Sequence, residues 1–67
     1  MRLLDLRSLR PGDLVEYQLP VSKRPTRGIF QYWHTTEQGQ LVLIVRSQYL
    51  GADLPVDPQR VIRFAHP

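Results

Sequence analysis

The chain has 67 residues, of which 42% are hydrophobic and 22% are charged. This balance excludes an intrinsically disordered segment and favours one small folded domain spanning residues 1–67. There is no cysteine, which excludes a disulfide framework and a thiolate metal site. Nine basic residues against six acidic ones give a net charge of +3 and favour an anionic partner.

The first ten residues place leucines among charged residues. Their spacing fits a short amphipathic helix or an irregular strand equally well. Arg10 precedes Pro11, so any helix should end by Leu9. We expect residues 1–10 to form an arm that packs on the rest of the domain. No apolar run approaches the ~20 residues of a membrane span, so we expect no membrane partner and a cytoplasmic location. The leucines of this arm are Leu3, Leu4, Leu6 and Leu9.

Pro11-Gly12 predicts a type II turn, because proline presets φ at the first central position and glycine supplies φ > 0 at the second. Residues 13–19 then alternate between apolar and polar side chains, which indicates a half-exposed strand. In this strand Val15, Tyr17 and Leu19 share one side.

Residues 20–27 form a basic surface loop in which two prolines bracket three cations, a composition that excludes a central strand. Long cations beside hydroxyl groups suit the phosphates of nucleic acid. The competing interpretation is a solvated loop whose charges only maintain solubility. The candidate phosphate contacts are Ser22, Lys23, Arg24, Thr26 and Arg27.

Residues 28–46 predict a β-hairpin that organises the fold. Aromatic and β-branched side chains fill its first arm, and residues 41–45 form a continuous apolar run of strand length. Gly39 stands third in the three-residue turn, where a residue with φ > 0 is required. This turn sets Thr36 opposite Gln40.

Side-chain alternation predicts that Phe30, Tyr32 and His34 share one face of this hairpin. With Arg46 opposite Phe30, the aromatic rings could form a stacking platform for bases. The alternative is that these rings belong to the core. Both faces are apolar enough to need a cover, from the N-terminal arm or from a second chain.

The last third of the chain gives weaker signals. Residues 48–56 give weak strand signals around Gly51, and Pro55 indicates an edge strand or a loop there. Asp57 as a cap and Pro58 at the first helical position predict one helical turn. A final strand over 61–64 should point Ile62 and Phe64 to the same side.

This order of elements resembles the SH3-like small β-barrels. The most specific local similarity is the entry into the first strand, Leu9-Arg10-Pro11-Gly12-Asp13-Leu14-Val15, and residues 57–64 resemble the closing turn and strand. The resemblance implies an all-β fold: a small five-stranded SH3-like barrel with one short helical turn before the last strand. Arg27-Gly28-Ile29 is similar to a glycine-centred motif of ribosomal and transcription-factor relatives.

The first loop departs from the acidic loop of SH3-like barrels that bind proline-rich peptides, because here it is basic. We therefore expect a non-catalytic module that contacts nucleic-acid phosphates, RNA or DNA, with no metal and no cofactor. The alternative is a small protein-interaction or regulatory subunit that uses the apolar hairpin to bind a partner chain or to form a homodimer. A ribonuclease-type toxin is the third interpretation, and no residue spacing supports catalysis.

Overall fold

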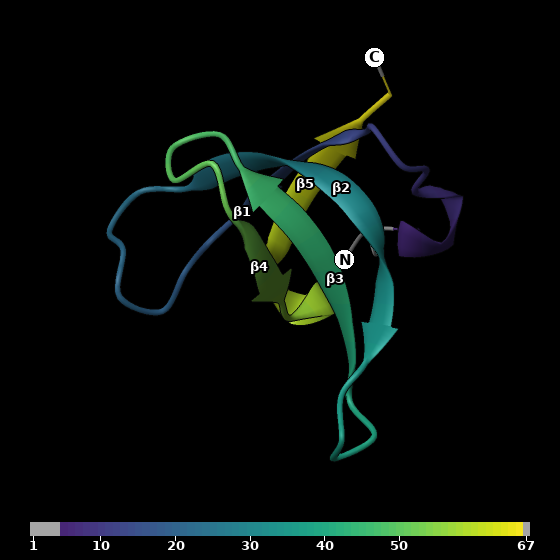
Figure 1. The fold of residues 1–67 in the computed structure, drawn as a ribbon. Coiled ribbons are helices and arrows are strands. Elements are labelled where there is room, and N and C mark those ends of the chain that lie inside the picture. Colours follow the sequence, from purple (N-terminus) through teal and green to yellow (C-terminus); the bar gives the residue numbers. More distant parts are fainter. Residues whose placement is uncertain (1–4, 67) are drawn as a thin grey trace.

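The computed structural model describes residues 5–66 as five short strands and two single 3₁₀ turns (Figure 1). The strands are antiparallel throughout. The predicted all-β class, with five strands and a helical turn before the last one, is confirmed. In chain order the elements are η1 (Leu6–Ser8), β1 (Leu14–Tyr17), β2 (Thr26–Thr35), β3 (Leu41–Ser47), β4 (Asp53–Val56), η2 (Pro58–Arg60) and β5 (Val61–Ala65).

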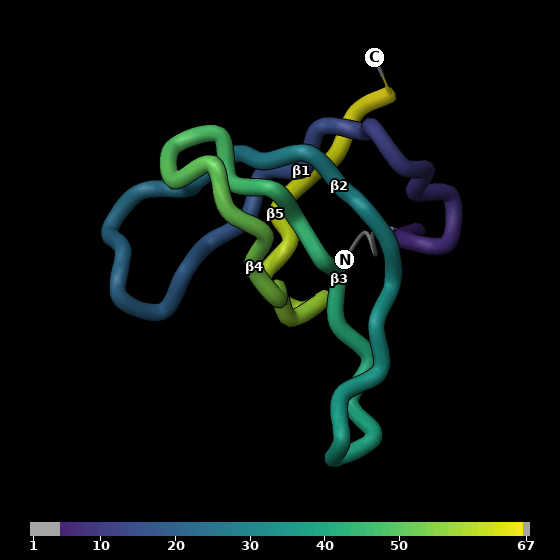
Figure 2. The backbone as a smooth tube through the Cα atoms, viewed as in Figure 1, coloured from purple at the N-terminus to yellow at the C-terminus, as the bar shows by residue number. Residues whose placement is uncertain are grey.

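The strands form one sheet in the order β4-β3-β2-β1-β5. The tube view shows this sheet strongly coiled, with β4 and β5 approaching each other at the start of β5 (Figure 2). The sheet is not closed into a barrel, because its two edge strands, β4 and β5, pair only with β3 and β1 and not with each other. Asp57 caps η2 by accepting a hydrogen bond from the Gln59 amide at 2.9 Å, as predicted.

The turns at Gly12 and Gly39 form as predicted. Gly12 has φ of 98°, and the Asp13 amide donates to the Arg10 carbonyl at 3.0 Å. Gly39 has φ of 84°, and the Thr36 amide donates to the Gln40 carbonyl at 2.8 Å. Both turns therefore rest on a glycine in the left-handed region, as the sequence indicated.

A β-bulge at Gln31 interrupts the hairpin and reverses the predicted faces of the first part of β2. The predicted register holds as far as Tyr32 opposite Ile44, but Phe30 pairs with Val45. An extra residue on one strand shifts every side chain before it to the other face. Phe30 is therefore only 2% exposed and meets the Trp33 ring edge to face at 5.8 Å, while Tyr32 is 55% exposed.

A second bulge, at Ile62, changes which side chains of β5 face the core. Glu16 pairs with Arg63, yet Tyr17 pairs with Val61, which leaves Ile62 as the extra residue. Val61 is therefore buried and Phe64 packs against the core, whereas Ile62 is exposed. The predicted alternation, with Ile62 and Phe64 on the same side, is wrong for this reason.

The core lies inside the curved sheet and includes Tyr17, Phe30 and Leu43. Leu9 is buried and Leu6 packs against the same cluster, so the described part of the arm covers the core; Leu3 and Leu4 lie outside the described residues. Gly28 permits the close approach of β2 and β3, because a Cβ there would lie 2.4 Å from Cγ1 of Val45. The other core side chains are Val15, Val45, Val56 and Val61.

The buried Asp13 joins the entry of β1 to the end of β5. Its Oδ2 accepts from the Arg10 amide at 2.9 Å and lies 2.7 Å from Nδ1 of His66. Its backbone carbonyl accepts from the Phe30 amide at 2.8 Å. Burial raises the pKa of Asp13, but the contacts with His66 and with the Arg10 amide outweigh burial and lower it overall.

The bulge at Gln31 predicts opposite effects for neighbouring aromatic residues. Phe30→Ala should destabilise the domain by ~3–5 kcal/mol, because it empties part of the core. Tyr32→Ala should cost less than ~1 kcal/mol, because the ring is mostly exposed. Urea unfolding of both variants measures the difference, and a larger loss from Tyr32→Ala would show that the bulge is misplaced.

Candidate nucleic-acid interface

Two irregular segments meet at one end of the sheet: the basic loop and the β3–β4 turn over 48–52. The loop was predicted over 20–27, but it spans residues 18–25, because β1 ends at Tyr17 and Thr26 and Arg27 already belong to β2. Figure 1 shows both on the same side of the molecule, away from η1. The Gln48 amide donates to the Arg27 carbonyl at 3.3 Å and ties the turn to the start of β2. Residues of both segments line one open cleft.

The β3–β4 turn presents Tyr49 to solvent. Ser47 is buried, its Oγ accepts from the Leu50 amide at 3.2 Å, and its carbonyl accepts from the Gly51 amide at 2.8 Å. These bonds hold the backbone of the turn that contains Tyr49. Tyr49 is 89% exposed, so its ring is open to solvent.

The basic loop is braced by its own polar groups. Ser22 Oγ donates to the Arg24 carbonyl at 2.9 Å, and the Ser22 amide donates to the Leu19 carbonyl at 3.2 Å. Lys23 and Arg24 are exposed, and no carboxylate of residues 5–66 pairs with either. The loop therefore holds two displayed cations on a backbone with local hydrogen bonds.

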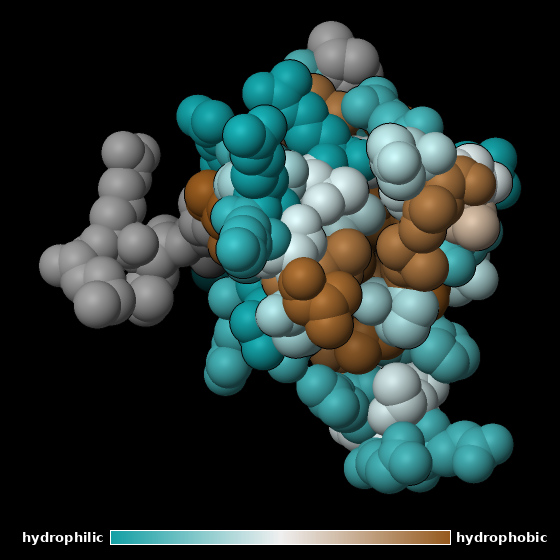
Figure 3. Space-filling view, turned by 90° about the vertical axis from the view of Figure 1, so that its left-hand side faces the viewer, coloured by the Kyte–Doolittle hydropathy of each residue, from teal (hydrophilic) through white to brown (hydrophobic). Residues whose placement is uncertain are grey.

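The two segments border a shallow, open cleft that is lined by both cations and an aromatic residue. Figure 3 views this side of the molecule and shows hydrophobic patches set among hydrophilic side chains. A guanidinium group and a displayed phenol ring are the groups that contact phosphates and stack on bases. The loop and β2 contribute Arg24, Pro25, Thr26 and Arg27, the turn contributes Gln48 and Tyr49, and β1 contributes Glu16.

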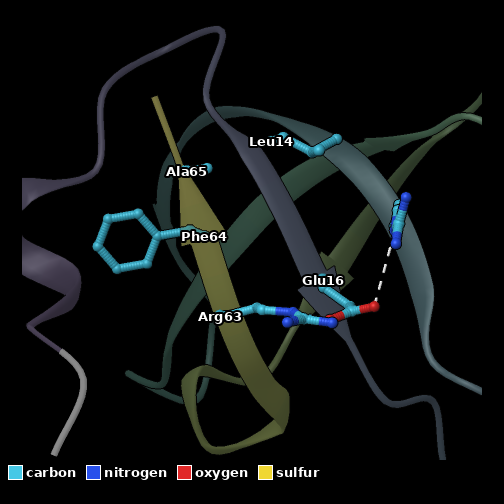
Figure 4. A pocket seen from close by; sticks show the side chains of 6 residues that line it. Leu14, Glu16, Arg63, Phe64 and Ala65 are labelled. Carbon is cyan, nitrogen blue, oxygen red and sulfur yellow. Dashed lines mark hydrogen bonds and ion pairs between the residues drawn. The ribbon is translucent and has the colours of Figure 1, made fainter. Parts of the chain in front are cut away.

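A second hollow adjoins the cleft on the outer face of β2, β1 and β5. The register sets Glu16 directly between Arg27 and Arg63. Nε of Arg63 donates to Oε2 of Glu16, and Nε of Arg27 lies 3.6 Å from Oε1 (Figure 4). Leu14, Phe64 and Ala65 complete the lining. Arg27, Glu16 and Arg63 thus form a row across the three strands. Because Glu16 and Arg27 line both hollows, the cleft and this row form one continuous surface.

Glu16 is the electrostatic centre of this surface. The hydrogen bond from Arg63 lowers the pKa of Glu16, burial opposes that effect, and the charges of Arg63 and Arg27 lower it further. The same hydrogen bond raises the pKa of Arg63. The row therefore carries one carboxylate and two guanidinium groups at neutral pH.

The structure brings only part of the predicted site residues together. Arg24, Thr26 and Arg27 line the cleft, while Ser22 and Lys23 lie in the adjoining loop. Phe30 lies in the core, and Tyr32 is exposed on the hairpin without lining the cleft. Arg46 lies opposite Ile29 instead of Phe30, because of the bulge, and pairs with Asp53 at 3.0 Å.

Sequence reasoning missed Tyr49, Glu16 and Arg63. The signal that could have revealed Tyr49 is an aromatic residue just before Leu50 and Gly51, where a turn can display its side chain. Glu16 and Arg63 were placed on strands, but only the β1–β5 pairing brings them together. That pairing joins residues 47 positions apart, which no local pattern reveals.

No protein-family model matches this chain, and comparisons with curated proteins and with solved structures find no match either. Within residues 5–66, no three His, Cys, Asp or Glu side chains gather where they could hold a metal ion. Neither helical turn in that range has the length or apolar character of a membrane-spanning helix.

The lowered pKa of Glu16 makes part of the stability depend on pH. A carboxyl group whose folded pKa lies below its unfolded value stabilises the fold fully above the unfolded pKa, and this contribution is lost as pH falls through the folded pKa. Asp13 behaves in the same way. Thermal melts from about pH 6 to about pH 3 should therefore show a smaller loss of stability for Glu16→Gln than for the wild type. Identical acid curves would contradict this role of Glu16.

Proposed function

We propose that this domain is a non-catalytic module that binds single-stranded nucleic acid in the cleft between the basic loop and the β3–β4 turn. The observation that supports this most strongly is the placement of the displayed Tyr49 ring in the same cleft as Arg24 and Arg27. Surface loops often carry cations, but a cation run beside a displayed aromatic ring matches what single-strand binders use.

The charge distribution supports an anionic ligand. Lys23, Arg24, Arg27 and Arg63 lie on or beside the cleft, where Glu16 is the one acidic residue of the two linings. In the rest of residues 5–66, four arginines stand against five acidic residues, so that part of the chain carries no excess positive charge. The excess positive charge of the chain is thus concentrated where a phosphate backbone would lie.

Stacking favours an unpaired strand over a duplex. A base stacked on Tyr49 must offer an open face, and bases inside a duplex already stack on their neighbours.

We further propose that the domain is SH3-like. The long loop after β1, the strand order and the 3₁₀ turn before β5 support that assignment.

The hairpin supports a second candidate function, protein interaction. Tyr32 and Leu41 are exposed there, 55% and 49% respectively, on a part of the molecule that does not line the cleft. A partner chain, or a second copy of this one, would cover these side chains. Such contacts depend little on salt, in contrast to phosphate binding.

Fluorescence anisotropy with a short labelled RNA, titrated across salt concentrations, tests the main proposal. Arg24→Gln should weaken binding and reduce the slope of log affinity against log salt by about 0.7, the value for one phosphate contact on a single strand. Tyr49→Ala should weaken binding by ~1–3 kcal/mol with an unchanged slope, because stacking releases no counterions.

Matched controls lie outside the cleft. Arg7→Gln removes an exposed guanidinium group from η1, on the opposite side of the molecule (Figure 1), and Tyr32→Ala removes the exposed hairpin ring. Both should bind RNA nearly as the wild type does. The proposal fails if the wild type does not bind RNA or single-stranded DNA at low salt, or if the controls weaken binding as much as the cleft variants do.

A further inference from the structure

The row formed by Arg27, Glu16 and Arg63 displays unused hydrogen-bond donors. Each arginine faces the carboxylate through its Nε. A guanidinium group has one Nε–H and four Nη–H donors, and no hydrogen bond within residues 5–66 engages the Nη groups of either side chain. These side chains are 61% and 71% exposed, so their Nη groups are open to a ligand.

The carboxylate that holds these arginines is itself almost enclosed. The Glu16 side chain is only 12% exposed, and its two oxygens face different strands, Oε1 towards β2 and Oε2 towards β5. A long flexible arginine loses rotamer entropy when it binds a ligand, and this cost falls when a neighbour already orders it. Glu16 thus orders two guanidinium groups on either side of β1.

We infer that Arg27, Glu16 and Arg63 form a clamp for the phosphate backbone of the bound strand, in which Glu16 is a positioning residue for both arginines. This inference rests on the proposed function and extends its cleft across β1 to β5. A strand whose base stacks on Tyr49 would place its backbone next to Arg27, which lines both hollows, and would continue towards Arg63.

The inference can be tested by whether removing the charge of Glu16 strengthens or weakens RNA binding. If Glu16 only neutralised the surface, removing its charge would strengthen binding of a polyanion. If it positions the arginines, removing its charge weakens binding even though the net charge of the domain becomes more positive. The lowered pKa of Glu16 keeps the carboxylate ionised at neutral pH in either case.

The experiment compares Glu16→Gln with Glu37→Gln in the RNA titration. Glu37 is exposed in the β2–β3 turn, so its variant makes the same change in charge and side-chain shape away from the row. Glu16→Gln should bind RNA about threefold to tenfold more weakly than the wild type, with a salt slope smaller by about 0.7 or more. Glu37→Gln should bind as tightly as the wild type or slightly more tightly.

Arg63→Lys is the second variant, because it keeps the charge of an exposed residue and should leave the fold intact. Lysine lacks the planar fork that the clamp requires, so this variant should also weaken binding, and thermal melting verifies folding of each variant. Tighter binding by Glu16→Gln, or wild-type binding by Arg63→Lys, overturns the clamp while leaving the cleft in place if Arg24→Gln and Tyr49→Ala still weaken binding. A wild type that binds no RNA overturns the proposed function and the clamp together.

Discussion

The two β-bulges decide which side chains this small sheet buries and which it displays. Without the extra residue at Gln31, Phe30 would lie on the outer face. Without the extra residue at Ile62, Val61 and Phe64 would lie on opposite faces, and only one of them could contact the core. A domain of this size has little apolar surface to bury, so losing Phe30 from the core would cost a large part of its stability. The displayed surface follows from the same register, because it leaves Arg27, Glu16 and Arg63 in one row across three strands.

The edges of the sheet also bear on how the domain meets partners. An exposed edge strand offers unpaired backbone groups to another chain. Here β4 carries Pro55, which has no amide hydrogen, and β5 carries the bulge at Ile62, which twists an edge away from flat pairing. Addition of a strand from a second copy is thereby disfavoured. Contact through displayed side chains, at the cleft or on the hairpin, fits this sheet better.

The local features of the fold were predictable because each depends on a few adjacent residues. Pro11-Gly12 and Gly39 specify their turns through φ, and Asp57-Pro58 specifies η2 through capping. The bulges were not predictable, since strict alternation was the more economical interpretation of residues 29–35 and 61–64. Closure of the sheet was overestimated, because a list of five strands does not say whether its edges pair.

The site shows the same division. The cations of the basic loop stand together in the sequence, so Arg24 and Arg27 were found. The bulge at Gln31 was not foreseen, so the buried Phe30 was grouped with the exposed Tyr32. Tyr49 reaches the cleft because Gln48 bonds to Arg27 across the turn, and Arg63 reaches Glu16 because β5 pairs with β1. Both depend on contacts between distant parts of the chain.

The central claim is that a single strand binds along the cleft and the arginine row, and an NMR titration tests it most directly. Adding a short single-stranded RNA to ¹⁵N-labelled protein should shift the amide signals of residues 22–27, apart from Pro25, and of residues 48–50, together with the Nε–H signals of Arg27 and Arg63. The amides around Tyr32 and Leu41 should stay in place. Shifts confined to Tyr32, His34 and Leu41, with the two arginine Nε–H signals unmoved, would contradict the account.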